Sequence, residues 1–303
     1  MGTRRKLSLI LAVLLILSVF AGCGKTQTDS EPQDPTVATE AAVKRQLREG
    51  VQTVLLSCTE TYERSEQSAG FRNANRANFM MLLVIDEQNG TITPVQINPD
   101  SAVSFSVSGK PEKVEIPAGM AFSYGSGGSD SSLNLLSAVS GLLGGVKIDH
   151  YLSFTMDAVA MVNDALDGVS VSDPAYFVDI SEESVRLSGP EAVAFFSFRD
   201  DADVTNEARM GRQHQYMRAI YGPFMAKADD EDFLSNLLLR LGDNMATDLT
   251  LSQLILMFET FEQYAMEEEV IVIKGRVESS GDTTRYIVDG SFVEEALGQL
   301  IFE

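Results

Sequence analysis

The sequence predicts an α/β fold in a single domain. Short apolar runs typical of buried strands alternate with segments in which apolar residues recur at the spacing of an amphipathic helix. Neither an internal repeat nor a second linker interrupts this alternation over the 303 residues. With 44% hydrophobic and 22% charged residues, the composition is ordinary for a globular protein, and the chain is long enough to form a large core.

The first part of the domain is predicted to contain three strands. Apolar runs occupy Val51–Cys58, Asn78–Asp86 and Gly90–Ile97, as expected for buried strands. The dipeptide Asn89-Gly90 between the second and third strands is a strong signal for a two-residue hairpin. We therefore expect these two strands to pair.

A strand–helix–strand unit is predicted in the middle of the chain. It is preceded by the loop Gly125–Ser132, GSGGSDSS, and by the helical pattern of Leu133–Leu143. Ile148–Phe154 is predicted to be a strand, Met156–Leu166 an amphipathic helix that Gly168 ends, and Val169–Val171 again extended.

The last third is mainly helical by pattern. Helices are predicted at Pro190–Phe196, at Asn206–Met225, which ends at Gly222-Pro223 or shortly after, and at Phe233–Leu241, Leu251–Tyr264 and Phe292–Ile301. A strand is predicted at Glu269–Val277.

Residues 1–22 have the pattern of a signal peptide, followed by a linker over residues 23–42 and the domain over residues 43–303. A positive stretch, Arg4 to Lys6, precedes the apolar run Leu7–Phe20, which is too short to span a bilayer comfortably. The segment VFAGC resembles a bacterial lipobox, so Cys23 is the predicted lipid anchor. An uncleaved membrane anchor is the alternative, and both place the domain outside the cytoplasmic membrane. The polar, proline-containing segment Gly24–Thr39 is typical of a flexible tether.

The charge and the cysteine count exclude several classes of function. A formal net charge of −21 repels phosphate backbones, so we expect no nucleic-acid partner. With Cys23 assigned to lipid, Cys58 has no disulfide partner and is expected to be a buried small hydrophobe. The two histidines, His150 and His214, lie far apart in sequence and with Cys58 make no metal-binding pattern.

Four arginines gather between positions 199 and 218 of this acidic chain: Arg199, Arg209, Arg212 and Arg218. Aspartates lie in the same segment, so a solvated face of mixed charge is one interpretation. An anion-binding site is the other. On a helix, Arg209, Arg212, Gln213 and Tyr216 recur at i, i+3, i+4 and i+7 and share one face.

Several segments taken together resemble the LytR–CpsA–Psr family of extracellular cell-envelope proteins. The resemblance runs from about Val51 to the C-terminus and rests on five stretches in the family's order. These stretches are Asn75–Asp86 (NRANFMMLLVID), Ala121–Gly125 (AFSYG), Asp149–Pro174, Leu187–Arg199 (LSGPEAVAFFSFR) and Arg209–Gln213 (RMGRQ).

This resemblance implies a mixed β-sheet flanked by helices, with a groove for a polyprenyl lipid. Typical members transfer a glycopolymer from an undecaprenyl-diphosphate carrier to a peptidoglycan hydroxyl, a phosphoryl transfer assisted by Mg²⁺. The matching phosphate-binding residues here are Arg76, Arg199, Arg209, Arg212 and Gln213. Asp100 matches the aspartate of a P-R-D triplet and is the candidate catalytic residue; a turn aspartate after Pro99 is the alternative.

The sequence also departs from the family's pattern. The two metal-binding aspartates fall at about Thr59 and at Asn78, and Glu60 replaces the first only by a one-residue shift. Glu60 and Asn78 are therefore the candidate metal ligands, although an amide is a poor substitute for the carboxylate that Mg²⁺ prefers.

Two phosphate-binding arginines of the family fall at Pro99 and Ser197, and a further aspartate falls at Asn206. Two hypotheses follow: an envelope glycopolymer phosphotransferase with a degenerate metal site, or a lipoprotein that binds polyprenyl phosphate or glycan without turnover. Tyr124, Phe195, Phe196 and Phe198 either line the lipid groove or, as is more common at such spacings, belong to the core.

Overall fold

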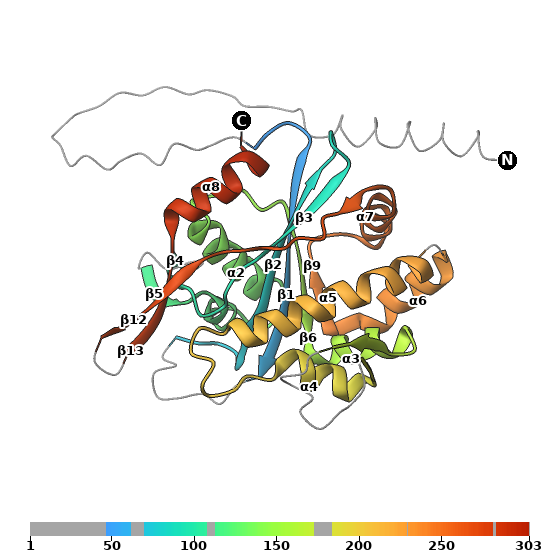
Figure 1. Ribbon diagram of the computed structural model, residues 1–303, viewed down its shortest axis with the longest axis horizontal. Helices are drawn as coiled ribbons and strands as arrows, with labels where there is room; N and C mark the ends of the chain where they lie inside the picture. Colours follow the sequence, from blue (N-terminus) through green and yellow to red (C-terminus); the bar gives the residue numbers. More distant parts are fainter. Residues whose placement is uncertain are drawn as a thin grey trace. The chain divides into compact units, whose positions relative to one another are not determined.

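The computed structural model describes residues 47–61, 70–107, 113–172, 184–228, 230–280 and 283–302. The predicted signal peptide, the linker and Cys23 lie outside these residues. The described part of the chain is built around a seven-stranded mixed sheet with helices on both faces, which confirms the predicted α/β fold (Figure 1).

Three consecutive strands form the middle of this sheet. β1 (Val51–Thr61) pairs antiparallel with β2 (Asn75–Asp86), and β2 pairs antiparallel with β3 (Thr91–Gln96). The predicted pairing is therefore confirmed. The predicted loop length is wrong, because four residues separate the paired Asp86 and Thr91, and Gly90 ends the turn with φ +63°.

The sheet is completed by strands that arrive from later in the chain. β6 (His150–Thr155) lies parallel to β1, and β9 (Met245–Thr247) pairs antiparallel with β6. On the opposite edge the short strands β10 (Ala265–Met266) and β11 (Ile271–Val272) both pair with β3. β1 and β2 are therefore central strands, and their ends position the site described below.

The two faces of the sheet pack against different helices. On one face lie η1 (Ala118–Tyr124), α2 (Ser129–Leu142) and α8 (Gly290–Ile301), around a core that includes Leu55, Met80 and Leu82. The other face packs against α3 (Met156–Ala165), α4 (Gly189–Ser197), α5 (Glu207–Ala228), α6 (Glu231–Leu241) and α7 (Leu251–Gln263). Alternate residues along each strand reach opposite cores, because side chains in a strand point to alternate faces.

Two parts of the chain differ from the prediction. The predicted strand Glu269–Val277 is divided between β11 and β12 (Gly275–Ser280), and β12 forms a separate hairpin with β13 (Thr283–Val288). α5 ends at Ala228, three residues beyond the predicted Met225, and it contains Pro223 although proline cannot donate the helical hydrogen bond. Two further hairpins, β4 (Ala102–Ser106) with β5 (Lys113–Pro117) and β7 (Val169–Val171) with β8 (Val185–Leu187), complete the fold together with η2 (Gly242–Asn244).

None of the helices in the described ranges is both long enough and apolar enough to cross a bilayer.

Candidate functional site

A β-bulge brings three polar side chains together where β1 ends and β2 begins. Cys58 pairs with Phe79, but the next residue of β1, Thr59, pairs with Ala77, so Asn78 is an extra residue in β2. A bulge of this kind re-aims a side chain that regular alternation would direct elsewhere. As a result Asn78 joins Glu60 and Arg76, which face each other across the ladder.

Glu60 is the acceptor at the centre of this group. Its Oε1 accepts hydrogen bonds from Nε and Nη2 of Arg76 at 3.1 and 2.9 Å. Its Oε2 accepts from Nδ2 of Asn78 at 2.9 Å. Asn78 is fully buried, and its Oδ1 has no hydrogen-bond partner among the described residues.

Arg209 reaches the same carboxylate from the first turn of α5. Its Nη1 lies 3.7 Å from Oε1 of Glu60, and the residue is 2% exposed. Burial lowers the pKa of Arg209 to about 10, while the charges of Glu60 and Asp100 act in the opposite direction. The pKa of Arg209 is thus influenced by both carboxylates, and also by Arg199 and Arg76, which lower it.

A second ion pair joins the loop that leads into α5 to the segment that follows β3. Nη1 of Arg199 is 2.7 Å from Oδ2 of Asp100, and both side chains are about a quarter exposed. Nε and Nη2 of Arg199 donate to the main-chain oxygen of Asp203 at 3.2 and 3.1 Å. The carboxylate of Asp203 in turn accepts from the backbone N–H of Arg209 at 3.1 Å, so the loop is tied to the start of the helix.

Asn98 connects this loop to the segment that follows β3. Its Nδ2 donates to the main-chain oxygen of Thr205 at 2.8 Å, and its Oδ1 accepts from the backbone N–H of Asp100 at 3.0 Å. Asn206, which has a positive φ of 64°, also donates to Asn98 Oδ1 at 3.3 Å. Asparagine tolerates the left-handed conformation better than most residues, which suits it to this helix start.

The predicted polar face of α5 is confirmed as a buried face. Arg212 is 6% exposed and its Nη2 donates to the main-chain oxygen of Phe198 at 2.7 Å. Gln213 donates from Nε2 to the main-chain oxygens of Asn78 and Phe196 at 3.1 and 3.2 Å. Tyr216 is buried one turn further, and its hydroxyl donates to Oδ1 of Asn163 at 3.2 Å.

The structure therefore brings together most of the predicted site residues that it describes, and Arg212 is on the same buried face of α5 as Arg209 and Gln213. We call these residues the arginine cluster: Arg76, Arg199, Arg209 and Arg212, with Glu60, Asn78, Asp100 and Gln213. Thr59 lies apart from the cluster, because its hydroxyl donates to the main-chain oxygen of Phe154 on the neighbouring strand. Ser197 donates to Val193 within α4, so its hydroxyl is committed to the helix.

The side-chain atoms of the cluster do not form a set of ligands that suits a Mg²⁺ ion. Mg²⁺ prefers several hard oxygen ligands in octahedral geometry, yet both Glu60 oxygens already accept hydrogen bonds from Arg76 and Asn78. Asn78 directs its NH₂ group and not its carbonyl oxygen toward Glu60. Within the described ranges, no group of three or more His, Cys, Asp and Glu side chains is placed to hold a metal ion.

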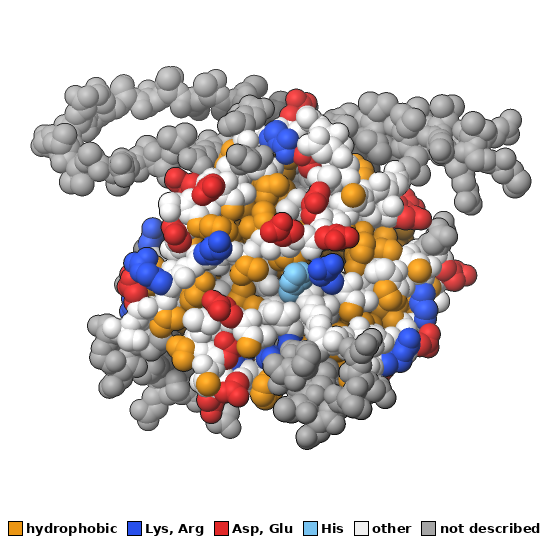
Figure 2. All heavy atoms as spheres, viewed as in Figure 1, with side chains coloured by type: hydrophobic (Ala, Val, Ile, Leu, Met, Phe, Trp, Pro, Cys, Tyr) orange, Lys and Arg blue, Asp and Glu red, His pale blue; other side chains and the backbone are white. Residues whose placement is uncertain are grey.

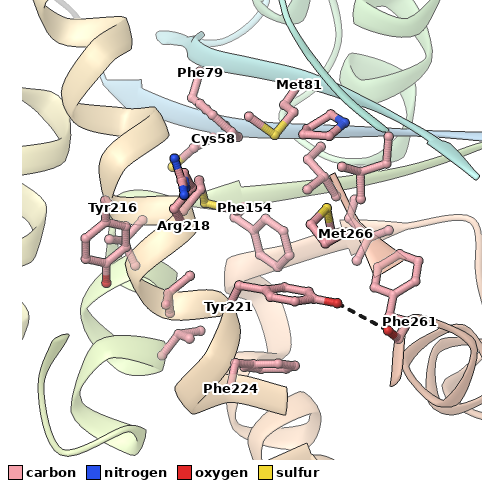
Figure 3. Close-up of a pocket in the computed structure, with 18 of the residues that line it drawn as sticks. Cys58, Phe79, Met81, Phe154, Tyr216, Arg218, Tyr221, Phe224, Phe261 and Met266 are labelled. Atoms are coloured by element: carbon pink, nitrogen blue, oxygen red, sulfur yellow. Dashed lines mark hydrogen bonds between the residues drawn. The ribbon is translucent and has the colours of Figure 1, made fainter. Parts of the chain in front are cut away.

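A large apolar cavity lies between the sheet and the helices of the second face. Its volume is about 540 Å³, and its walls include residues of β1, β2, β6 and of the helices α3 to α7. Figure 3 shows Phe79 and Met81 of β2 on one side of it, and Tyr221 and Phe224 of α5 on the other. Figure 2 shows apolar side chains reaching the surface beside α7, with acidic groups around them.

The cavity and the arginine cluster are neighbours. Cys58 and Phe79 line the cavity, and Glu60 and Asn78 of the cluster lie within two residues of them on the same strands. Gln213 bridges the two, because it bonds the main-chain oxygens of Asn78 in the cluster and of Phe196 on the cavity wall. A ligand with an anionic head and an apolar tail would match this arrangement.

The aromatic residues considered for the groove divide between these locations. Phe196 lines the cavity, whereas Phe195 is core and Tyr124 is buried in the core on the opposite face of the sheet. Phe198 is 45% exposed, and the Arg212 guanidinium lies 5.1 Å from its ring centroid.

Sequence reasoning missed most of the cavity wall, and it gave no role to His214, which lines the cavity together with Arg218. Both are on α5 one turn apart, and their i, i+4 spacing was the available signal. Cys58 is buried and free as expected, and burial raises the pKa of its thiol.

Comparison with known proteins gives a family match, sequence relatives and solved structures of similar fold. The sequence profile of the LytR_cpsA_psr family matches residues 14–300. A relative from Bacillus mycoides, the polyisoprenyl-teichoic acid–peptidoglycan teichoic acid transferase TagU, is 24% identical over 243 residues, which are 78% of this chain and 76% of the relative. TagU of Bacillus cereus strain ATCC 14579 is 25% identical over 231 residues, with 74% and 70% covered.

Solved structures share the fold at lower identity. Bacillus subtilis TagV superposes with a TM-score of 0.65 at 17% identity, over 84% of this chain and 96% of that one. The protein gbs0355 of Streptococcus agalactiae gives 0.67 at 16% identity, over 82% and 86%. TagT bound to LI-WTA gives 0.63 at 17% identity, over 86% and 96%. These likenesses agree with the mixed sheet flanked by helices.

Proposed function

The chain belongs to the LytR–CpsA–Psr family, and on this basis we propose that it binds a polyprenyl-(di)phosphate-linked glycopolymer outside the cytoplasmic membrane, for attachment to peptidoglycan. The TagU relatives are named for the transfer of polyisoprenyl-linked teichoic acid to peptidoglycan, and a structural neighbour is TagT bound to LI-WTA. The partners of this chain are then a glycolipid, peptidoglycan and, through Cys23, the membrane.

One observation carries the proposal: the arginine cluster adjoins the apolar cavity. Guanidinium groups bind phosphate oxygens with several directed hydrogen bonds, and such bonds are stronger where water is excluded. The cavity accommodates an isoprenoid tail by hydrophobic burial. Arg76, Arg199, Arg209 and Arg212 bind the phosphates, and Gln213 holds the junction between head and tail.

The proposed site is better equipped for binding than for metal-assisted transfer. Mg²⁺ would neutralise the diphosphate charge in family members, whereas in this chain the hydrogen bonds of Glu60 with Arg76 and Asn78 support a degenerate metal site. Asp100 is the candidate base for the acceptor hydroxyl, and its partner Arg199, 2.7 Å away, holds its carboxylate in position. Because the second carboxylate and two arginines of the family pattern are missing, the alternative is a lipoprotein that binds the glycolipid without turnover.

A binding experiment on the purified full chain tests the proposal. Arg199→Ala and Arg209→Ala are each expected to weaken polyprenyl-phosphate binding about tenfold or more, since hydrogen bonds to charged groups contribute about 1.5–3 kcal/mol. Arg276→Ala is the control, because Arg276 is exposed on β12 and pairs with Glu278. Equal and negligible effects of all three changes would reduce the cluster to a structural feature.

The location is tested separately. Cys23→Ser is expected to stop lipid labelling and to release the protein from the membrane. Unchanged labelling in that variant would refute the lipid anchor and favour an uncleaved membrane anchor.

A further inference from the structure

Glu60 makes, inside the protein, a contact that an anionic ligand would make. Nε and Nη2 of Arg76 converge on Glu60 Oε1 at 3.1 and 2.9 Å, and Asn78 Nδ2 donates to Oε2 at 2.9 Å. A phosphate oxygen is an acceptor of the same charge, and a guanidinium binds carboxylate and phosphate by the same geometry. Glu60 and a ligand phosphate would therefore compete for Arg76.

Arg209 has donor capacity that Glu60 does not use. Its Nη1 is 3.7 Å from Glu60 Oε1, which is beyond hydrogen-bond distance, and its buried Nε has no partner among the described residues. A cation that is 2% exposed needs a nearby anion, because burial removes the water that would otherwise stabilise its charge. A ligand phosphate would provide both the hydrogen bonds and the charge.

A divalent cation at Glu60 is disfavoured by the same neighbours. To bind Glu60 it would displace Arg76 and Asn78 from the carboxylate oxygens. It would then lie against the guanidiniums of Arg76 and Arg209, and like charges repel strongly where water is scarce. To act as a metal ligand, Glu60 would need free carboxylate oxygens, but in this chain the guanidinium of Arg76 is bonded to one of them.

We propose that Glu60 is a displaceable internal counter-ion of Arg76 and Arg209, which the phosphate group of the ligand replaces without a divalent cation. The inference rests on the proposed function, because it assumes that the arginine cluster binds phosphate. The Glu60 side chain is 21% exposed, so it has a path to solvent when the phosphate arrives. Its presence offsets part of the positive charge of the cluster in the free protein and lowers the affinity for the ligand.

The test is the affinity of the full chain for farnesyl diphosphate and for inorganic pyrophosphate, by calorimetry with EDTA and with Mg²⁺. Glu60→Gln removes the charge but keeps the shape and one acceptor oxygen, so we expect about tenfold tighter binding of both probes. EDTA is expected to change neither affinity. The matched control is Glu278→Gln, an exposed glutamate of β12 that pairs with Arg276, and it is expected to have no effect.

A second measurement uses the unchanged chain and so does not depend on how the variant folds. The side-chain Nε–H resonance of Arg76, assigned with Arg76→Lys, is expected to shift on addition of pyrophosphate in EDTA. A resonance that does not move while the probe binds would show that Glu60 stays on Arg76, and would overturn the inference.

The remaining outcomes separate the inference from the proposed function. Unchanged or weaker binding by Glu60→Gln, or loss of binding in EDTA, overturns the inference alone and favours a metal-ligand role for Glu60. Binding of neither probe by the unchanged chain refutes the anion site, and both proposals with it. If farnesyl diphosphate binds no more tightly than pyrophosphate, the proposal that the cavity binds the lipid tail is refuted. The role of Glu60 as a counter-ion is not affected by that result.

Discussion

Nη2 of Arg212 donates a hydrogen bond to the main-chain oxygen of Phe198 at 2.7 Å, and the same guanidinium lies over the Phe198 ring. Phe198 is the C-cap residue that follows α4, and Arg212 is on α5, so the contact joins α5 to the end of α4. Arg212 therefore has a structural role beside the phosphate-binding role proposed for it. Arg218, six residues further along α5, is exposed and makes no such contact within the described ranges.

Arg212→Met is expected to lower the free energy of unfolding by about 2 kcal/mol, because a hydrogen bond from a charged group to the main-chain oxygen of Phe198 is lost. Arg218→Met, the control on the same helix, is expected to change it by less than about 0.5 kcal/mol, as is usual for surface substitutions. Urea denaturation of both variants measures the difference. Similar values for the two would mean that the contact with Phe198 contributes little.

Filling the apolar cavity is expected to weaken binding of the lipid tail and to leave binding of the phosphate head group unchanged. Met257 of α7 lines the cavity and is half-buried, so the larger indole of Met257→Trp would take up part of its 540 Å³. Loss of burial for two methylenes costs about 1.6 kcal/mol, or about tenfold in the Kd of a polyprenyl phosphate. Inorganic pyrophosphate, which has no tail, is expected to bind as before.

The control for this cavity prediction is Leu239→Trp, since Leu239 is 70% exposed on α6 and does not line the cavity. Calorimetry with both ligands distinguishes the outcomes. If Met257→Trp weakened pyrophosphate as much as polyprenyl phosphate, the cavity would not be the tail site.

Gly119 is expected to be irreplaceable where η1 approaches β2. An added Cβ would lie 2.2 Å from the main-chain oxygen of Ala77 and 3.1 Å from Pro99 Cβ, and the backbone of a central strand cannot yield easily. Gly119→Ala is expected to cost about 3 kcal/mol of stability by overpacking. Because Ala77 precedes the bulge at Asn78, phosphate binding is expected to weaken as well.

Gly298 of α8, unlike Gly119, has room for a side chain, because an added Cβ would have no atom within 4 Å. Gly298→Ala is expected to raise stability by about 0.5–1 kcal/mol, because alanine is the better helix former. Thermal unfolding of the pair checks both signs. Equal melting temperatures would contradict the close approach of η1 and β2.

The parts of the site that the sequence predicted are those with local periodicity. Arg209, Arg212 and Gln213 were predicted to share one face because a helix repeats every 3.6 residues, and all three are buried there. The pairing of β2 with β3 followed from a turn signal between two apolar runs. In each case the information lies within a few residues of the element itself.

The parts that were not predicted depend on contacts between distant segments. The bulge at Asn78 is a property of the pairing between β1 and β2, so it could not be predicted from the sequence of either strand alone. Neither does the sequence distinguish Phe196, which lines the cavity, from Phe195, which is solid core, since both are apolar residues of α4. β12 and β13 are short and rich in polar residues, and so gave a weaker strand signal than the central strands.

Asp86 is expected to make the protein sensitive to acid. Burial acts to raise its pKa, but hydrogen bonds from Asn89 and the charge of Arg48, 2.6 Å away, outweigh it and hold the pKa below the ordinary value. A depressed folded-state pKa stabilises the protein above the unfolded pKa, about 3.9, and this stability is lost as the pH falls through the folded value. The decline is therefore expected below about pH 4.

Asp86→Asn is expected to be less stable at pH 7 and to lose less stability on acidification. Asp201→Asn is the control, because Asp201 is exposed and makes no hydrogen bond or ion pair in the described part of the chain. Chemical denaturation between pH 2 and pH 7 measures both. Parallel pH profiles for Asp86→Asn and the unchanged protein would refute the role of Asp86.

Asn78→Asp is expected to create a metal-dependent stability at Glu60. Asn78 is fully buried and donates from Nδ2 to Glu60 Oε2 at 2.9 Å, so the change replaces a donor with a second carboxylate beside the first. Without metal, the like charges and the lost hydrogen bond are expected to lower stability by about 2–3 kcal/mol. With Mg²⁺, the two carboxylates supply hard oxygen ligands, and binding to the folded state restores stability by mass action.

The readout is the melting temperature with millimolar Mg²⁺ and with EDTA, which requires no substrate. The melting temperature of Asn78→Asp is expected to rise by several degrees in Mg²⁺, since 1 kcal/mol corresponds to about 2–4 °C for a domain of this size. The unchanged chain and Asn78→Leu, which loses the same hydrogen bond without adding charge, are expected not to respond. Release of polyprenyl phosphate from a diphosphate substrate is a separate readout. It is expected in the triple variant Asn78→Asp, Pro99→Arg and Ser197→Arg, and little or none is expected in the unchanged chain. A clear Mg²⁺-dependent rise in the unchanged chain would mean that Glu60 leaves Arg76 for the metal, and that the natural site is a metal site after all.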